Sequence, residues 1–281
     1  MYNDLFHIGP VTIHGYGLMI GIGFLTAIVV TMLRAKKKGL NAEMILDLAL
    51  ICIFAGFLGA KLLYMIVEWK TLIKDPLSVI GSEGFVVYGG ILLGAGGCIF
   101  YIRKKKLDFW MLFDLIMPQV ALAQAIGRIG CFLAGCCYGA PTDSPLGIVF
   151  PEGSMPLAGI KVWPTQLFSS AGDLTIAAIL LFLSTKMKKK GTIGALYMIL
   201  YGIGRFMIEF LRIDQRGSVG FLSTSQFISI FIVLGGIAIM VYLFFFRKDK
   251  ELSEKEALID EREGSEKEVS SDEKDLSEKD T

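Results

Sequence analysis

Residues 16–38 read YGLMIGIGFLTAIVVTMLRAKKK, and this stretch decides the fold. Its first eighteen residues carry no charge, and four bases follow within the next five positions. As a helix, eighteen residues span about 27 Å, which is close to the thickness of the hydrocarbon core of a bilayer. A cleaved signal peptide has its positive charges before the apolar segment rather than after it. The stretch is therefore predicted to be a retained membrane helix.

Six further apolar stretches follow along the chain. Hydrophobic residues make up 53% of the 281 residues, and the mean hydropathy is +0.59. A water-soluble domain could not bury that apolar content, whereas a bundle of membrane helices exposes it to lipid. We predict an all-α polytopic membrane protein with about seven transmembrane helices, over residues 16–33, 44–67, 84–102, 110–130, 165–185, 192–211 and 224–246.

Basic residues mark the ends of alternate stretches. Runs of Lys and Arg follow the first, third, fifth and seventh stretches, at residues 34–38, 103–106, 186–190 and 247–250. Because cytoplasmic loops carry an excess of bases, these four ends are predicted to face the cytoplasm. The N-terminus is then extracytoplasmic and the C-terminus cytoplasmic.

The end of the chain differs from the rest in charge. Residues 251–281 hold 13 acids and 5 bases, a net charge of −8, which leaves +9 for residues 1–250. The segment has no aromatic residue and no sustained apolar period, which is typical of disorder. We predict a transmembrane domain over residues 1–246 and a charged, disordered cytoplasmic tail over 247–281.

Ionisable side chains inside the predicted spans are the first candidates for function, because each costs several kcal/mol in the membrane. They are Lys61, Asp114, Arg128, Asp173, Arg205, Glu209 and Arg212. The direction of each helix puts most of them near the extracytoplasmic ends, with Arg205 somewhat deeper. Asp114 and Asp173 are expected nearer the cytoplasmic side or the midplane, apart from this group.

The sixth stretch has the most informative spacing. Tyr201, Arg205 and Glu209 follow one another at intervals of four, which places them on one helix face and lets Arg205 pair with Glu209. Gln124 and Arg128 share a face of the fourth stretch in the same way. Two guanidinium groups at similar depth favour a phosphate site, because Arg offers a planar bidentate fork. An interhelical polar latch without a substrate is the alternative.

Glycines surround several of these polar positions. Residues 127–139 read GRIGCFLAGCCYG, and four glycines just beyond the fourth stretch indicate that the backbone approaches another group closely. No strand precedes this run, which argues against a dinucleotide-binding loop. Two further Gly-flanked polar sites are Tyr88 before Gly89 and Gly90, and the segment 14–17 with His14 and Tyr16. Tyr16 alone is also typical of an interfacial aromatic belt.

Taken in this order and topology, the motifs resemble the bacterial prolipoprotein diacylglyceryl transferases over nearly all of residues 10–246. The family signature, Gly-Arg-x-Gly-Asn-Phe closing on Gly, corresponds to residues 127–139. A His two residues before Tyr-Gly-Leu-Met corresponds to residues 14–19, and Tyr-Gly-x-x-Arg-x-x-x-Glu-Phe-x-Arg corresponds to residues 201–212. A Pro-x-Gln-Leu element corresponds to residues 164–167, and a later Gln-x-Ser element matches Gln226 only loosely.

The resemblance implies transfer of the diacylglyceryl group from phosphatidylglycerol to the lipobox cysteine thiol of a prolipoprotein, with glycerol phosphate as the leaving group. Arg128 would bind the head group, Arg205 would stabilise the phosphate charge in the transition state, and Glu209 would orient Arg205. Tyr16 and Tyr201 would position the substrate through their hydroxyls. Further positions expected at the site are His14, Gly89, Gly90, Gly127, Gly130, Gly139 and Arg212.

The implied partners are phosphatidylglycerol, prolipoprotein signal peptides and membrane lipids, with no nucleic acid. The implied location is the bacterial cell membrane. No cofactor and no metal are expected, because the arginines already supply positive charge.

The chain departs from the family pattern at positions of chemical importance. The family's His before Gly-Gly, thought to act as the base, is Tyr88 here, and the Asn of the signature is Cys131. The later acidic position is Cys136, the His of a His-Pro element is Trp163, and the Glu closing that element is Ser169. A phenol with an ordinary pKa of about 10 is a weak base at neutral pH unless nearby arginines lower that pKa. The chain is therefore a transferase that uses Tyr88, a paralogue with another lipid group or acceptor, or a lipid-binding descendant without catalysis.

The cysteines suggest interpretations of other classes. Cys131 with Cys136 or Cys137 could form an extracytoplasmic thiol–disulfide relay, although the Cys-x-x-Cys pattern is missing. A zinc site with His14 is a further alternative, and simple packing of small apolar residues is another. A seven-helix transporter is disfavoured, because the charges gather at one face rather than along a path through the midplane.

Overall fold

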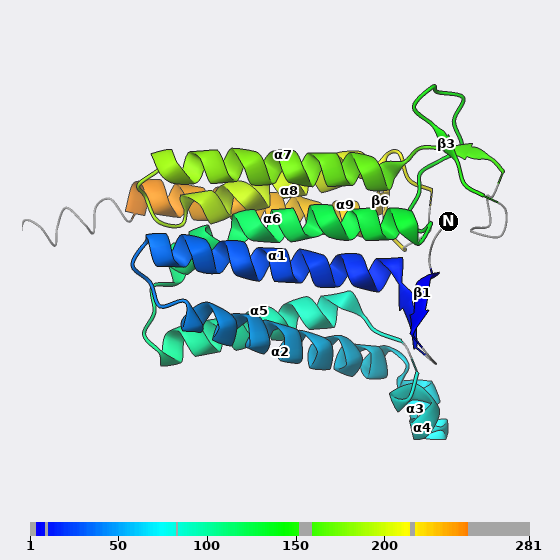
Figure 1. Ribbon diagram of the computed structural model, residues 1–281, viewed down its shortest axis with the longest axis horizontal. Helices are drawn as coiled ribbons and strands as arrows, with labels where there is room; N and C mark the ends of the chain where they lie inside the picture. Colours follow the sequence, from blue (N-terminus) through cyan, green and yellow to red (C-terminus); the bar gives the residue numbers. More distant parts are fainter. Residues whose placement is uncertain (1–3, 9–10, 83, 152–158, 214–216, 247–281) are drawn as a thin grey trace, which may run out of the picture.

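The computed structural model describes residues 4–8, 11–82, 84–151, 159–213 and 217–246, so the predicted tail over 247–281 lies outside the described residues. Within the described part, helices of 18 to 25 residues cover all seven predicted stretches and run along the long axis of the molecule (Figure 1). They are α1 (Gly15–Lys37), α2 (Glu43–Val67), α5 (Val87–Lys104), α6 (Phe109–Leu133), α7 (Thr165–Lys186), α8 (Thr192–Glu209) and α9 (Thr224–Val241), the last continued by the π-helix η1 (Tyr242–Phe246).

Five of these helices are long and apolar enough to cross a membrane: α1, α2, α6, α7 and α9 with its continuation to Phe245. Their outer faces carry large exposed apolar side chains, such as Phe54 at 70% and Phe182 at 63% exposure. Lipid tails are the solvent in which such a surface is stable. The all-α polytopic membrane fold is confirmed, whereas the passage of α5 and α8 through the membrane and the direction of the bundle remain predictions.

Short elements gather at one end of the bundle. There lie the hairpins β1 (Asp4–Ile8) with β2 (Val11–His14), β3 (Ile148–Val149) with β4 (Lys161–Val162), and β5 (Ser218–Val219) with β6 (Leu222–Ser223). The helices α3 (Trp69–Lys74) and α4 (Pro76–Ile80) lie at the same end. Three of the predicted basic runs, over residues 34–38, 103–106 and 186–190, lie in the described part of the chain at the opposite end of the bundle, so the two ends differ in charge as well as in structure.

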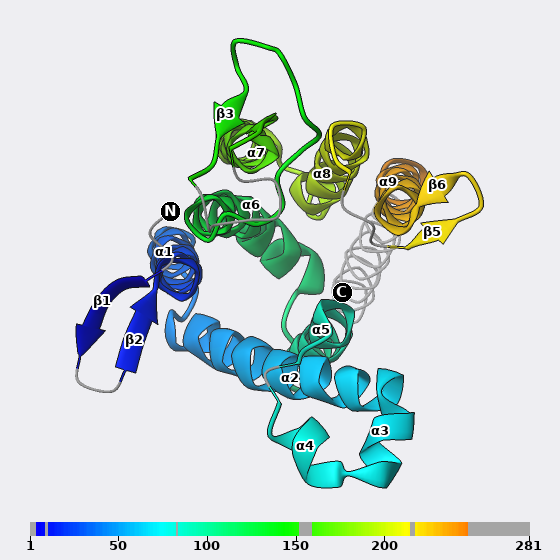
Figure 2. The ribbon, with the colours of Figure 1, turned by 90° about the vertical axis from the view of Figure 1, so that its right-hand side faces the viewer.

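The helices pack in two groups that can be seen from the end of the bundle (Figure 2). α1, α6, α7, α8 and α9 form an arc, and α2 packs on α5 in a second layer. Glycines make the second contact possible, because a Cβ on Gly89 would meet the carbonyl oxygen of Gly59 and one on Gly90 would lie 2.8 Å from the Gly56 oxygen. Small residues let membrane helices approach in this way.

Two charged side chains, one intramembrane and one from a basic run, have structural partners at the end with the basic runs. The Asp114 carboxylate accepts hydrogen bonds from the backbone N–H groups of Gly191 (2.6 Å) and Gly194 (2.8 Å), so it caps the start of α8 from α6. Arg34 donates to Gln119 (3.0 Å) and to Ser184 (2.9 Å), which joins α1, α6 and α7. Asp114 thus stands apart from the outer charges, as predicted.

Lys61, near the opposite end of the bundle, also has structural partners. Its Nζ donates to the Ser82 carbonyl oxygen (2.6 Å) and lies 5.3 and 5.1 Å from the ring centroids of Tyr64 and Phe85. These contacts tie the connection before α5 to α2 and account for a charged side chain in the apolar second half of that helix.

Candidate active site

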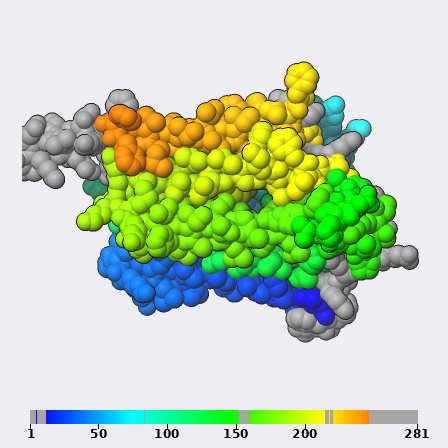
Figure 3. Space-filling model, turned by 90° about the horizontal axis from the view of Figure 1, so that it is seen from above, coloured from blue at the N-terminus to red at the C-terminus, as the bar shows by residue number. Residues whose placement is uncertain are grey.

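A pocket of about 300 Å³ opens between α6, α7 and α8. On the face seen in Figure 3, a hollow appears where the surfaces of α7 and α8 separate. Its polar lining comes from all three helices: Arg128 on α6, Ser169 and Asp173 on α7, and Tyr201 and Arg205 on α8. The structure thus brings together Arg128, Tyr201 and Arg205 at one place.

The predicted separation of Asp173 from this group is wrong. Asp173 is 8% exposed, lines the same pocket and lies within electrostatic range of both Arg128 and Arg205. It follows Ser169 by one helical turn, so the two share the inner face of α7. The sequence predicted the depth of Asp173 from its position along one helix and so placed it too far from the arginines. The pocket extends from the predicted extracytoplasmic helix ends toward the middle of the bundle and includes Asp173.

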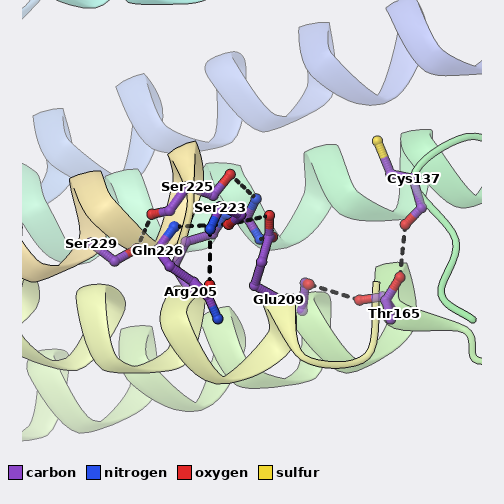
Figure 4. A network of polar contacts seen from close by, with 9 residues as sticks. Cys137, Thr165, Arg205, Glu209, Ser223, Ser225, Gln226 and Ser229 are labelled. Carbon is purple, nitrogen blue, oxygen red and sulfur yellow. Dashed lines mark hydrogen bonds and ion pairs between the residues drawn. The ribbon is translucent and has the colours of Figure 1, made fainter. Parts of the chain in front are cut away.

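Arg205 is held by the start of α9 (Figure 4). Its guanidinium pairs with the Glu209 carboxylate at 2.7 Å, as the spacing predicts, and donates to the Ser225 hydroxyl at 2.8 Å. Ser223 in turn donates to Glu209 at 2.9 Å. The ion pair is nearly buried, with 12% and 7% of the two side chains exposed, so neither group can leave it cheaply. Glu209 lies behind Arg205 rather than in the pocket lining.

The residues that hold Arg205 were missed in the sequence, although a signal for them exists. Ser223 and Gln226 form a capping box at the start of α9, and the Ser-x-x-Gln spacing announces such a cap. The cap places Ser223 and Ser225 at the N-terminal turn, facing α8. The loosely matched Gln226 therefore has a clear structural role.

Arg128 differs from Arg205 because it has no fixed partner. Its side chain is half-buried and lines the pocket, and no hydrogen bond or ion pair joins it to another side chain in the described part of the chain. Asp173 likewise makes no hydrogen bond to any described residue. With Glu209 counted, the formal charges of the pocket balance, but only Arg205 and Glu209 are paired to each other. Arg128 and Asp173 are free to bind a polar ligand.

Tyr201 is oriented by a second tyrosine that the sequence did not single out. The rings of Tyr201 and Tyr197 stack with centroids 5.6 Å apart and planes 15° from parallel. Tyr197 is buried and donates its hydroxyl to the Gln124 side-chain oxygen at 2.9 Å. The stack and this hydrogen bond fix the direction in which the Tyr201 phenol points.

The glycine-rich segment does not begin beyond the fourth helix. α6 continues to Leu133, so Gly127, Arg128 and Gly130 belong to the helix itself. A Cβ on Gly130 would lie 2.9 Å from the Met19 Cβ, so this glycine lets α6 approach α1. For Gly127 the expected close approach is wrong, since a Cβ there would have no atom within 4 Å.

The segment after α6 is hydrogen-bonded to the start of α7 and to the residues just beyond the end of α8. Thr165 donates to the Cys137 carbonyl oxygen and Gln166 to that of Cys136, both at 2.7 Å, which explains the Pro-x-Gln-Leu element at the start of α7. A Cβ on Gly139 would lie 2.5 Å from the Leu211 oxygen, so only glycine fits there. The backbones of Gly139 and Arg212 pair as an isolated bridge, which anchors Arg212 just beyond α8.

The other predicted site residues lie around this centre. Tyr88 is 47% exposed in the first turn of α5, outside the pocket lining but within electrostatic range of Tyr201. Gly89 and Gly90 face α2 rather than the pocket. Tyr16 is 43% exposed at the start of α1, within electrostatic range of Arg128, and His14 is exposed at the end of β2.

A bundle of long apolar helices with a pocket lined by charged side chains from three of them defines a polytopic membrane protein with a buried polar site. Comparison with known proteins gives the family. The sequence profile of the prolipoprotein diacylglyceryl transferases matches residues 3–242. The chain belongs to this family, and it is a multi-pass transferase of the cell membrane.

Individual relatives agree with the profile. The chain is 48% identical over 227 residues to the phosphatidylglycerol–prolipoprotein diacylglyceryl transferase 2 of Clostridium perfringens, covering 80% of this chain and 89% of the relative. It is 47% identical over 235 residues to the corresponding transferase of Clostridium tetani, covering 83% and 94%. The transferase of Finegoldia magna is 36% identical over 239 residues, covering 84% and 93%. This similarity favours a transferase over a transporter or a thiol–disulfide relay.

Proposed function

We propose that this protein transfers the diacylglyceryl group of phosphatidylglycerol to the lipobox cysteine of prolipoproteins and so forms a thioether. The observation that carries the proposal is the pocket in which Arg128, with no fixed partner, lies together with the firmly held Arg205. Both residues fall in motifs of the family, and the names of the relatives give the same two substrates.

The reaction needs positive charge around a phosphodiester. A thiolate sulfur attacks the glycerol carbon that bears the phosphate, a C–S bond forms, and the C–O bond to the phosphate breaks. The electron pair leaves with glycerol phosphate, whose charge grows during the step. Guanidinium groups fixed before the reaction stabilise that growing charge. Arg205 suits this role because Glu209 and Ser225 fix it, whereas Arg128 can adapt to the incoming phosphate.

Asp173 gives the pocket a second kind of contact. The head group of phosphatidylglycerol ends in a glycerol with two free hydroxyls, and a carboxylate accepts hydrogen bonds from such a pair. We assign the phosphate to Arg128 and Arg205 and the head-group hydroxyls to Asp173. Tyr201, held by its stack on Tyr197, lies beside them and donates its hydroxyl to the lipid.

The acceptor peptide is assigned to the rim of the site. His14 directly precedes α1, and Tyr16 lies in its first turn within electrostatic range of Arg128. Tyr88 lies in the first turn of α5 within electrostatic range of Tyr201. Gly127 leaves open space on α6 next to Arg128, where lipid or peptide can lie. Tyr88 takes the position of the family's base, and its hydroxyl is the group that the sequence predicts to carry the thiol proton.

The test is transfer by the purified full chain in detergent, with phosphatidylglycerol and a synthetic lipobox peptide. We expect the peptide to gain the mass of a diacylglyceryl group and glycerol phosphate to appear in equal amount. Arg128→Gln should abolish both, whereas Arg103→Gln, at the other end of the bundle, should change neither. Lipid binding without any mass gain would show a non-catalytic protein, and a different added mass would show a paralogue with another donor.

A further inference from the structure

Three thiols meet at the end of α6. The Sγ atoms of Cys131, Cys136 and Cys137 all lie within 4.8 Å of one another. Cys131 is buried in the last turns of the helix, and the other two are half-buried in the segment that follows. His14, which the zinc alternative would need as a ligand, does not belong to this group.

The backbone is bent so that the thiols converge. Neighbouring side chains of an extended chain point in opposite directions, but Cys136 and Cys137 both reach Cys131. Cys137 has a φ of +64°, a left-handed conformation that a residue with a Cβ seldom adopts, and Gly135 has a φ of +67°. The hydrogen bonds from Thr165 and Gln166 to the carbonyl groups of Cys137 and Cys136 hold this conformation from α7.

The arrangement suits a thiophilic metal ion. Zinc bound tetrahedrally by thiolates has Zn–S distances of about 2.3 Å, which separates the sulfurs by about 3.8 Å, within the observed limit. Catalytic zinc sites have three protein ligands and an open fourth position, and soft sulfur ligands select zinc over magnesium or calcium. We propose that Cys131, Cys136 and Cys137 bind a zinc ion whose open position takes the acceptor thiol of the prolipoprotein.

The surroundings fit this use. Three thiolates and one zinc ion carry a net charge of −1, and Arg128 lies one turn before Cys131 on the same face of α6. The Arg128 side chain lines the pocket and lies within electrostatic range of Cys131, so it connects the pocket with the three thiols, which lie outside the pocket lining.

The proposal rests on the proposed function and supplies a step that function lacks. A thiol that coordinates zinc is deprotonated, and its proton leaves to water. The zinc-bound sulfur then attacks the glycerol carbon, the C–O bond breaks with its electron pair on glycerol phosphate, and the thioether, a neutral and weaker ligand, dissociates. Tyr88 then need not act as the base for the acceptor thiol.

The first measurement is the metal itself. Full-length protein purified in detergent, loaded with Zn²⁺ and dialysed, should retain one zinc per chain by mass spectrometry of the metal. Cys131→Ser, Cys136→Ser and Cys137→Ser should each lose it, whereas Cys98→Ser on α5 should keep it. A parent protein that retains no zinc, or that contains a disulfide within the cluster, overturns the proposal.

The second measurement separates the metal's role from the transfer reaction. Co²⁺ in place of Zn²⁺ should show a sulfur-to-cobalt band, and the visible bands should shift when the lipobox peptide is added but not when its cysteine is serine. Removal of zinc with 1,10-phenanthroline should reduce transfer at least 100-fold, and added Zn²⁺ should restore it. Arg128→Gln should lose transfer yet keep the zinc and the cobalt shift.

The outcomes distinguish the two claims. Full transfer by the zinc-free protein overturns thiol activation and leaves the transferase assignment intact. A cobalt shift with the thiol peptide but no transfer by the parent overturns the proposed function and leaves the thiol-binding metal site intact.

Discussion

Replacing Arg205 by Lys keeps the positive charge but removes the guanidinium fork. Arg has five N–H donors, of which one pairs with Glu209 (2.7 Å) and one binds Ser225 (2.8 Å). Three donors therefore remain for the phosphate. Lys has three donors in all, so one remains if both protein contacts are kept. The substitution should remove about two charge-assisted hydrogen bonds to the phosphate.

The expected cost follows from the value of such bonds. Each contributes about 1.5–3 kcal/mol, so the loss is about 3–6 kcal/mol of transition-state stabilisation. That corresponds to a decrease in kcat/KM of about 10²- to 10⁴-fold. The decrease should appear mostly in kcat, because Arg205 is assigned to the charge that grows on the leaving group.

The assay is transfer to a lipobox peptide in detergent micelles with varied phosphatidylglycerol, followed by peptide mass. Arg103→Lys is the matched control, because Arg103 is exposed in the last turn of α5 at the opposite end of the bundle. A kcat/KM for Arg205→Lys within about threefold of the parent would refute the reasoning, since charge alone would then suffice.

Three further changes test other parts of the site. Asp173→Asn keeps the shape of the side chain but loses its charge, so the KM for phosphatidylglycerol should rise about tenfold while the KM for the peptide stays constant; an unchanged lipid KM would remove Asp173 from the head-group site. Gly139→Ala should lower the unfolding temperature by several °C because its Cβ meets the Leu211 oxygen at 2.5 Å, whereas Gly96→Ala, with open space around it, should not; equal melting of the two would contradict the packing. Tyr88→Phe should retain activity within about threefold if zinc deprotonates the acceptor thiol, and a loss above 100-fold would return the proton to the Tyr88 hydroxyl.

Much of the fold could be predicted because its signals are local. An apolar stretch of about twenty residues identifies a membrane helix without knowledge of its neighbours, and all seven stretches became helices of 18 to 25 residues. The pairing of Arg205 with Glu209 was also predictable, because both residues lie on one helix at a spacing of four. Predictions of this kind need only the periodicity of a single helix.

The parts that failed depend on how helices meet. Asp173 was placed outside the site because its depth was judged on α7 alone, whereas the pocket is defined by α6 and α8 as well. Ser225 and Tyr197 act on Arg205 and Tyr201 through contacts that depend on helix rotation. Gly127 and Gly139 lie in the same motif, but a Cβ would clash with neighbouring atoms at Gly139 and would not at Gly127. A motif shows which residues belong together, but not which of them touch the ligand.

The cysteines show how a departure from a family pattern can be interpreted once its geometry is known. By the resemblance of the motifs, Cys131 and Cys136 correspond to an amide and an acid of the family pattern, and Tyr88 corresponds to its histidine. The structure places the two cysteines and Cys137 in one cluster, with Cys131 within electrostatic range of Arg128. Neither the cluster nor Tyr88 belongs to the pocket lining. A disulfide relay would use two of the three thiols and leave the third without a function, and it would not explain why the left-handed Cys137 is held toward the others. A metal uses all three and leaves a fourth position for the thiol that the reaction must deprotonate. In this proposal, zinc held by the three thiols deprotonates the acceptor thiol, so that a histidine base is not needed.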